Sequence, residues 1–186
     1  MLDEQGFEIY ENNDFPLAYL ITFRTYGTWL HGDDRHSVDT HGKNIYGTQD
    51  IAPKSELETA MKNNMKQSAL ILDELQRKTV EIAIKELCEQ RGYFFQAINV
   101  RSNHVHIVVS AQAKPERIAD AFKAFATKKL REENLISNET KVWSRGRSRR
   151  YLWKPRHVTL AIDYVLYSQG DLPFEIFAEI AETRTK

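Results

Sequence analysis

The 186-residue chain contains one cysteine, Cys88, and no apolar run longer than a strand. A single cysteine cannot form an internal disulfide, and it lacks the thiolate partners that a zinc finger requires. The acidic N-terminus, MLDEQGFEIYENN, differs from a signal peptide, which begins with basic and then apolar residues. We therefore expect a cytoplasmic protein with no segment in a membrane.

Glycine and proline are also scarce, with 8 and 5 residues, and no segment has a biased composition. This scarcity argues against collagen-like repeats, solenoids and extended disorder. The chain is 41% hydrophobic and 28% charged, and its length suits one compact core. We expect a single globular domain over 1–186.

The chain has no net charge, because 26 basic residues balance 26 acidic ones, but the charges are segregated. Residues 1–60 contain 11 acidic and 4 basic residues. Residues 141–156 contain 7 basic and no acidic residues. Such a local cluster is typical of phosphate-backbone binding, although a solvated basic loop explains the composition equally well.

Hydrophobic patterning predicts a mixture of strands and helices. Strands are expected over 17–24, 93–100 and 104–110, with a hairpin between the last two. Helical spacing predicts one or two helices between Ser55 and Gln90, followed by Gly92, and further helices over 115–130, 158–168 and 173–182. Hydrophobic residues show neither the helical nor the strand period over 25–53, which predicts a long loop.

The basic segment 141–157, KVWSRGRSRRYLWKPRH, is expected to form a short hairpin around Arg145–Arg147. The resulting order of elements fits a ferredoxin-like α+β fold. In this fold, an antiparallel sheet has helices packed on one face, and the C-terminal helices are added to it.

Two histidines stand two residues apart in the strand HVHIVVS. Alternation along a strand points the side chains of His104 and His106 to the same side. Two neighbouring imidazoles supply half of a metal site, whereas a bland interpretation puts both on the solvent face. His-x-His also occurs in cupins and, in two copies, in two-histidine phosphoesterases, but this chain has one copy.

Tyr164 lies on the predicted helix that follows the basic segment. A tyrosine at such a position usually fills a core. A phenol has a pKa near 10 and is a weak nucleophile at neutral pH, so catalysis by Tyr164 needs a nearby cation. A divalent ion held by the histidines meets this need.

The strand HVHIVV, the segment WSRGRSRRYLW and the helix DYVLYSQGD together resemble the HUH endonuclease superfamily. The resemblance is to single-tyrosine transposases of small bacterial insertion sequences, particularly REP-associated tyrosine transposases. It spans 17–172 and includes the first strand with TFRTYGTWLHGD, which begins within it.

This resemblance implies a ferredoxin-like fold, a divalent metal (Mg or Mn) and a substrate of single-stranded DNA with hairpins. His104 and His106 become metal ligands, and Tyr164 becomes the nucleophile. Its attack forms a 5′-phosphotyrosine and releases a 3′-hydroxyl, so strands can be cut and rejoined without ATP. Family members act as monomers or as homodimers with shared sites.

The sequence departs from the family at the position four residues after the tyrosine, where a glutamine or asparagine is common. Ser168 occupies it, and Gln169 follows. We expect Gln169 as the third metal ligand, with Ser168 or Asp34 as alternatives. Tyr167 is the alternative nucleophile, but the aliphatic residue after the family's tyrosine favours Tyr164.

DNA recognition is expected from the basic segment. The residues expected to contact phosphates are Arg145, Arg147, Arg149, Arg150 and Lys154. Trp143, Tyr151 or Trp153 can stack on unpaired bases, and the alternative is that the tryptophans anchor the core.

Two other functions are compatible with these residues. A domesticated nucleic-acid-binding module of the same fold would have lost catalysis, as the change at Ser168 allows. A small-molecule metalloenzyme would use the histidine pair, but this function leaves the arginine cluster unexplained.

Overall fold

The computed structural model describes residues 14–28 and 55–168, and the structural statements below concern these residues. The expected helix over 173–182 and most of the expected loop over 25–53 lie outside them. So do two candidate metal ligands, Asp34 and Gln169.

Four strands and four helices make up the described chain. In order they are β1 (Ala18–Arg24), α1 (Ser55–Asn63), α2 (Glu74–Arg91), β2 (Phe94–Val100), β3 (His104–Ser110), α3 (Pro115–Glu132), β4 (Ser148–Leu152) and α4 (Pro155–Tyr167). The strands and helices expected from hydrophobic spacing are thus present within the described residues, with ends shifted by a few positions.

The strands form one antiparallel sheet in the order β2-β3-β1-β4. With α2 and α3 as the connections, the strands follow the β-α-β-β-α-β pattern of the ferredoxin-like fold. The expected α+β class is therefore confirmed. The first strand of the chain, β1, lies inside the sheet, between β3 and β4.

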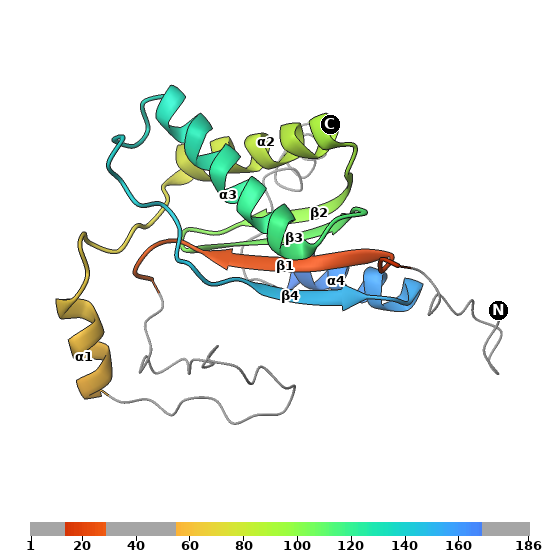
Figure 1. Ribbon diagram of the computed structural model, residues 1–186, viewed down its shortest axis with the longest axis horizontal. Coiled ribbons are helices and arrows are strands. Elements are labelled where there is room, and N and C mark those ends of the chain that lie inside the picture. Colours follow the sequence, from red (N-terminus) through yellow and green to blue (C-terminus); the bar gives the residue numbers. More distant parts are fainter. Residues whose placement is uncertain (1–13, 29–54, 169–186) are drawn as a thin grey trace, which may run out of the picture.

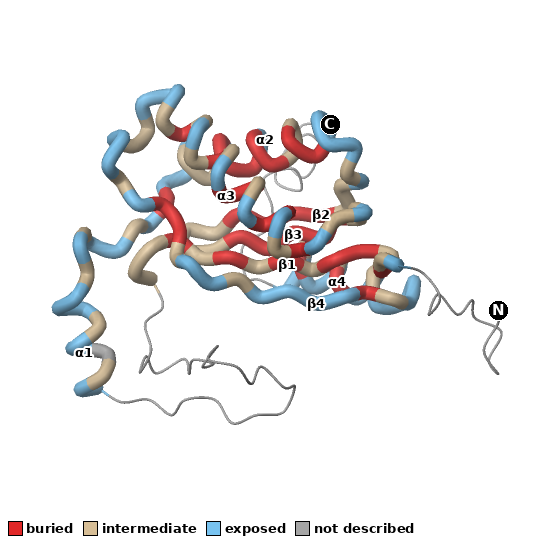
Figure 2. Tube along the Cα trace, viewed as in Figure 1, coloured by how far each residue is buried: buried red, intermediate tan, exposed pale blue. Residues whose placement is uncertain are grey.

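Helices cover both faces of the sheet (Figure 1). α2 and α3 cover one face, here called the α2–α3 face, where the main core contains Phe23, Ile84, Ile107 and Phe122. Most of the buried residues lie between these helices and the sheet (Figure 2). α4 covers the opposite face, here called the α4 face, through a smaller cluster: Ala18, Ala97, Val108, Leu152, Ala161 and Val165.

Local signals explain where α2 begins and ends. Asp73 and Gln76 form a reciprocal capping box at its start, and Gly92 adopts the left-handed conformation after its end, with φ of 65°. The predicted helical region is therefore two helices, α1 and α2, separated by a non-helical connection. Among the described helices, none combines the length and apolar composition needed to cross a bilayer.

The expected hairpin around Arg145–Arg147 is wrong. Trp143 forms a bridge with Thr25, and β4 then pairs with β1 from Ser148 onward, so the chain follows the edge of β1 without turning back. Ser144 still donates its backbone N–H to the Arg24 carbonyl at 2.9 Å, and residues 145–147 then bulge out of the pairing with β1.

Lys123 of α3 provides a physical reason for this bulge. Its Nζ donates hydrogen bonds to the carbonyl oxygens of Ser144 and Gly146, both at 2.9 Å. The side chain is buried, and burial together with the neighbouring Arg147 lowers its pKa to about 8, while Asp120 acts in the opposite direction. One lysine thus fixes the turn that leads into β4.

Lys123→Met is expected to destabilise the fold more at pH 9.5 than at pH 7. Between pH 8 and 10.5 the unfolded chain keeps the Lys123 proton that the native state has lost, so stability from this group rises with pH. Losing the hydrogen bonds should cost about 1–3 kcal/mol. Urea unfolding at both pH values measures the difference.

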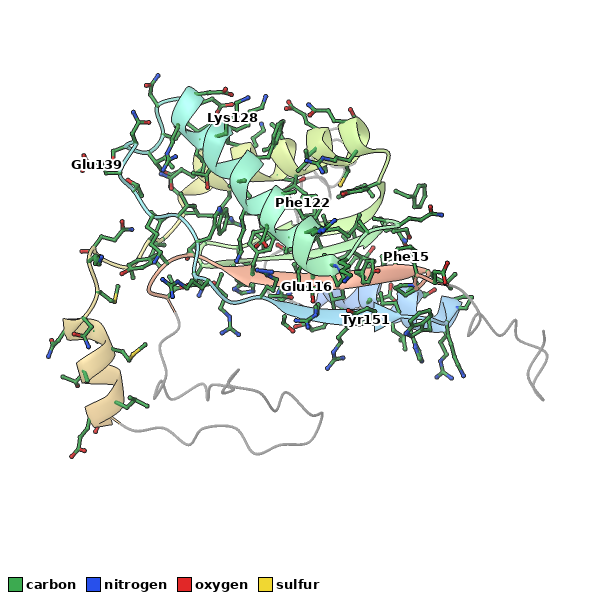
Figure 3. All side chains as sticks on the ribbon, in the orientation of Figure 1. Phe15, Glu116, Phe122, Lys128, Glu139 and Tyr151 are labelled. Carbon is green, nitrogen blue, oxygen red and sulfur yellow. The ribbon has the colours of Figure 1, made fainter. Side chains whose placement is uncertain are left out.

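Lys128→Met is the control, because Lys128 is an exposed lysine on the same helix (Figure 3). It should show no such pH dependence. An equal destabilisation by Lys123→Met at both pH values would contradict the assigned pKa.

Candidate active site

Polar side chains form a row across three strands on the α4 face. The register places Thr22 of β1 opposite His106 of β3, and His106 opposite Asn99 of β2. His104 lies two residues before His106 on the same face, and the two imidazole centroids are 4.6 Å apart. The strand therefore brings both histidines together, as the sequence predicts.

Hydrogen bonds orient both imidazole rings. His104 Nδ1 lies 2.6 Å from the side-chain oxygen of Asn103, which can only accept, so this nitrogen carries the proton. His106 Nδ1 lies 2.7 Å from the hydroxyl of Thr22. A proton on Nδ1 leaves the lone pair on Nε2, the arrangement typical of metal-binding histidines. The donor set therefore fits a divalent ion.

Tyr164 reaches this site from α4. Its ring lies 5.5 Å from the His106 ring, centroid to centroid, and is 41% exposed. The helix is held in place by Ala161 and Val165, which are buried against the sheet. Asn99 adds a hydrogen bond of 3.1 Å from its amide nitrogen to the carbonyl oxygen of Val165. A buried polar contact thus fixes the helix one residue after the phenol.

Tyr167, the alternative nucleophile, lies near the end of α4 and is 63% exposed. The ring contact with His106 is made by Tyr164. The structure therefore brings His104, His106 and Tyr164 together, and the role of Tyr164 as the nucleophile stays a prediction.

The histidine pair has no third acidic, histidine or cysteine side chain gathered with it among the described residues. Within residues 14–28 and 55–168, no three such side chains gather as a metal site would require. Ser168 lies at the C-terminal end of α4, is exposed, and donates its backbone N–H to the Tyr164 carbonyl at 3.1 Å. Gln169 and Asp34 lie outside the description.

The basic segment divides between the two faces. Arg147 contacts Asp120 at 2.8 Å, and Arg149 contacts Glu116 at 2.6 Å, so α3 carboxylates compensate both charges. Glu116 lies at the start of α3, on the α2–α3 side of the sheet (Figure 3). Arg150 is opposite Leu20 in the register, and therefore projects toward the α4 face.

The other residues predicted to contact DNA differ in their exposure to solvent. Arg145 and Lys154 are exposed, and Lys154 is the N-cap residue of α4. Trp143 is only 8% exposed, packs edge to face on Phe23, and donates its indole N–H to the Lys123 carbonyl at 3.0 Å. Trp143 is therefore a core anchor, the alternative left open by the sequence.

Tyr151 and Trp153 differ from Trp143. Tyr151 is exposed and Trp153 is half-buried. Their rings are nearly parallel, with an interplanar angle of 10° and centroids 6.5 Å apart. Tyr151 is opposite Tyr19 in the register, and the two ring centroids are 5.3 Å apart, so the aromatic pair lies on the α2–α3 face of β4, opposite to Arg150.

Three supporting residues were not found from the sequence: Thr22, Asn99 and Asn103. The role of Asn103 could have been predicted, because the residue directly precedes His104 in the sequence. The roles of Thr22 and Asn99 could not, since they depend on the register of β1, β2 and β3.

A family model described as IS200-like transposase matches residues 57–164, more than half of the chain. The matched range includes both histidines and ends at Tyr164. Among solved structures, a candidate transposase from Deinococcus radiodurans R1 is similar, with 12% sequence identity and a TM-score of 0.44. The similarity covers 80% of this chain and 88% of that one. No curated protein matches the sequence.

Asn99→Asp is expected to loosen α4 while the sheet stays folded. An ionised carboxylate cannot donate to the Val165 carbonyl, and holding the side chain protonated at this fully buried position costs free energy at neutral pH, so the contact should be weakened by at least about 1–3 kcal/mol. Hydrogen exchange should be faster at α4 amides than in the wild type. Asn64→Asp makes the same change at an exposed position and should not alter exchange in α4. Unchanged α4 exchange in Asn99→Asp would contradict the anchoring role.

Proposed function

Because the chain belongs to the family of IS200-like transposases, we propose that it cuts and rejoins single-stranded DNA through Tyr164. The observation that carries this proposal is the contact between the exposed Tyr164 ring and His106, with His104 alongside. An accessible phenol next to two oriented imidazoles suits a nucleophile that attacks a phosphate.

The reaction is a transesterification. The Tyr164 oxygen attacks phosphorus, and the bond from phosphorus to the 3′-oxygen breaks, which gives a 5′-phosphotyrosine and a 3′-hydroxyl. The phenol loses a proton and the leaving oxygen gains one, so protons balance. A 3′-hydroxyl from another strand end reverses the step, so strands are exchanged without ATP.

His104 and His106 would hold the divalent metal, Mg or Mn, through their Nε2 atoms. A bound divalent ion supplies Lewis-acid polarisation of a phosphate oxygen. Gln169 stays our proposal for the third ligand. Asn103 favours the His104 tautomer that metal binding requires, and Thr22 orients the His106 ring.

Single-stranded DNA, in our proposal, reaches Tyr164 across the β4 edge of the sheet. Arg150 and Lys154 lie on the side of α4, and Arg145 is exposed in the segment before β4. Tyr151 and Trp153, on the α2–α3 side of the same edge, can stack on unpaired bases of DNA that crosses it, at about 1–3 kcal/mol for each base. Arg147 and Arg149 contribute less, because Asp120 and Glu116 already compensate their charge.

Tyr164→Phe tests the function directly. The variant should fold and bind a hairpin-containing single-stranded oligonucleotide, because only a half-exposed hydroxyl is removed. With Mg²⁺ or Mn²⁺ it should form no covalent protein–DNA adduct, since the attacking oxygen is missing. Denaturing gel electrophoresis with labelled DNA measures the adduct.

Tyr167→Phe is the matched control and should form the adduct. Adduct formation by Tyr164→Phe, with loss in Tyr167→Phe, would assign the nucleophile to Tyr167. Binding without adduct in the wild type would favour a binding module that has lost catalysis.

The double variant Arg150→Ala/Lys154→Ala should bind single-stranded DNA with a weaker salt dependence. Each lost phosphate contact lowers the slope of log affinity against log salt by roughly 0.7. Fluorescence anisotropy over a salt series measures it. Arg147→Ala/Arg149→Ala should change the slope less than Arg150→Ala/Lys154→Ala does. A larger change would indicate that the DNA binds on the α3 side of the sheet.

A further inference from the structure

Arg24 is the last residue of β1 and lies beside the candidate site. The register places it opposite His104, two residues after Thr22, whose hydroxyl contacts His106. Side chains two apart in a strand share a face, so the Arg24 side chain projects to the α4 face with the histidines. A guanidinium therefore belongs to the row of polar groups next to His104.

Regular strand pairing is interrupted beside Arg24. Pairing between β1 and β4 ends at Thr22 and Ser148, and between there and the bridge of Thr25 with Trp143 the Ser144 N–H donates to the Arg24 carbonyl at 2.9 Å. The intervening bulge contains Gly146, where an added Cβ would meet no heavy atom within 4 Å. Arg24 itself is half-buried, unlike the exposed Arg145 and Arg150.

On the basis of the proposed function, we propose that Arg24 is a catalytic residue that binds a nonbridging oxygen of the scissile phosphate. During attack by Tyr164, negative charge accumulates on these oxygens. A guanidinium stays protonated at any working pH and offers a planar pair of donors to phosphate oxygens. Arg24 gains and loses no proton in the step, and its contribution is electrostatic.

This role differs from that of the basic residues near β4. Arg150 and Lys154 lie on the exposed rim, where phosphate contacts determine affinity. Arg24 is in the same row as His104, on the face of the sheet that α4 covers. Its loss should therefore lower the rate at saturating DNA more than it lowers affinity.

The test compares Arg24→Ala, Arg24→Lys and wild type in single-turnover adduct formation with saturating oligonucleotide. Arg24→Ala should lower the rate about 100- to 1,000-fold, the usual effect of removing one transition-state donor. Its dissociation constant should change much less. Arg24→Lys keeps the charge but loses the planar donor pair, and should lie between the two. Circular dichroism checks folding, and Arg24→Lys carries the test if Arg24→Ala does not fold.

Arg117→Ala is the matched control. Arg117 is an exposed arginine on α3, and α3 covers the other face of the sheet. It should react at the wild-type rate. Wild-type rates in both Arg24 variants, or weaker binding with an unchanged saturated rate, would overturn the role of Arg24 and leave the proposed function intact.

Sulfur substitution supplies a readout that a structural role would not change. Replacing the nonbridging oxygen that Arg24 contacts by sulfur should slow the wild type for one of the two phosphorothioate diastereomers. This penalty should shrink in Arg24→Ala, because the contact is already lost. An equal penalty in both proteins would overturn the contact. No adduct in either wild type or Arg117→Ala would overturn the proposed function, and this inference with it.

Discussion

The pairing of β1 with β3 is the constraint on which the candidate site depends. In this register, Ile21 and Phe23 face the main core with Val105 and Ile107, while Thr22 and Arg24 face α4 with the two histidines. A slip of one residue would move every one of these side chains to the opposite face. The buried aliphatic face therefore fixes the register, and the register in turn places the polar row.

The sequence was sufficient for features that depend on local spacing. Periods of two or about 3.6 residues predict three of the four described strands, the helix before Gly92, the same-face histidines and the helix that carries Tyr164. The tyrosine choice came from the family resemblance, and the structure places that ring against His106.

Features that depend on contacts between distant segments could not be predicted. Thr22 and His106 are 84 positions apart, and only the sheet brings them together. Trp143 stands among arginines in the sequence, yet its indole is buried against Phe23. The hairpin expected near Gly146 failed for the same reason, since Lys123 on α3 binds the carbonyls of that turn.

The place of β1 inside the sheet also constrains how the protein is made. The first strand of the chain pairs with β4, more than a hundred residues later, and α4 follows β4. Until the ribosome has synthesised both, one edge of β1 stays open for pairing with another chain. Contacts this distant in sequence form slowly. On the proposed function, a nascent or truncated chain that ends before Tyr164 therefore holds both histidines without the proposed nucleophile.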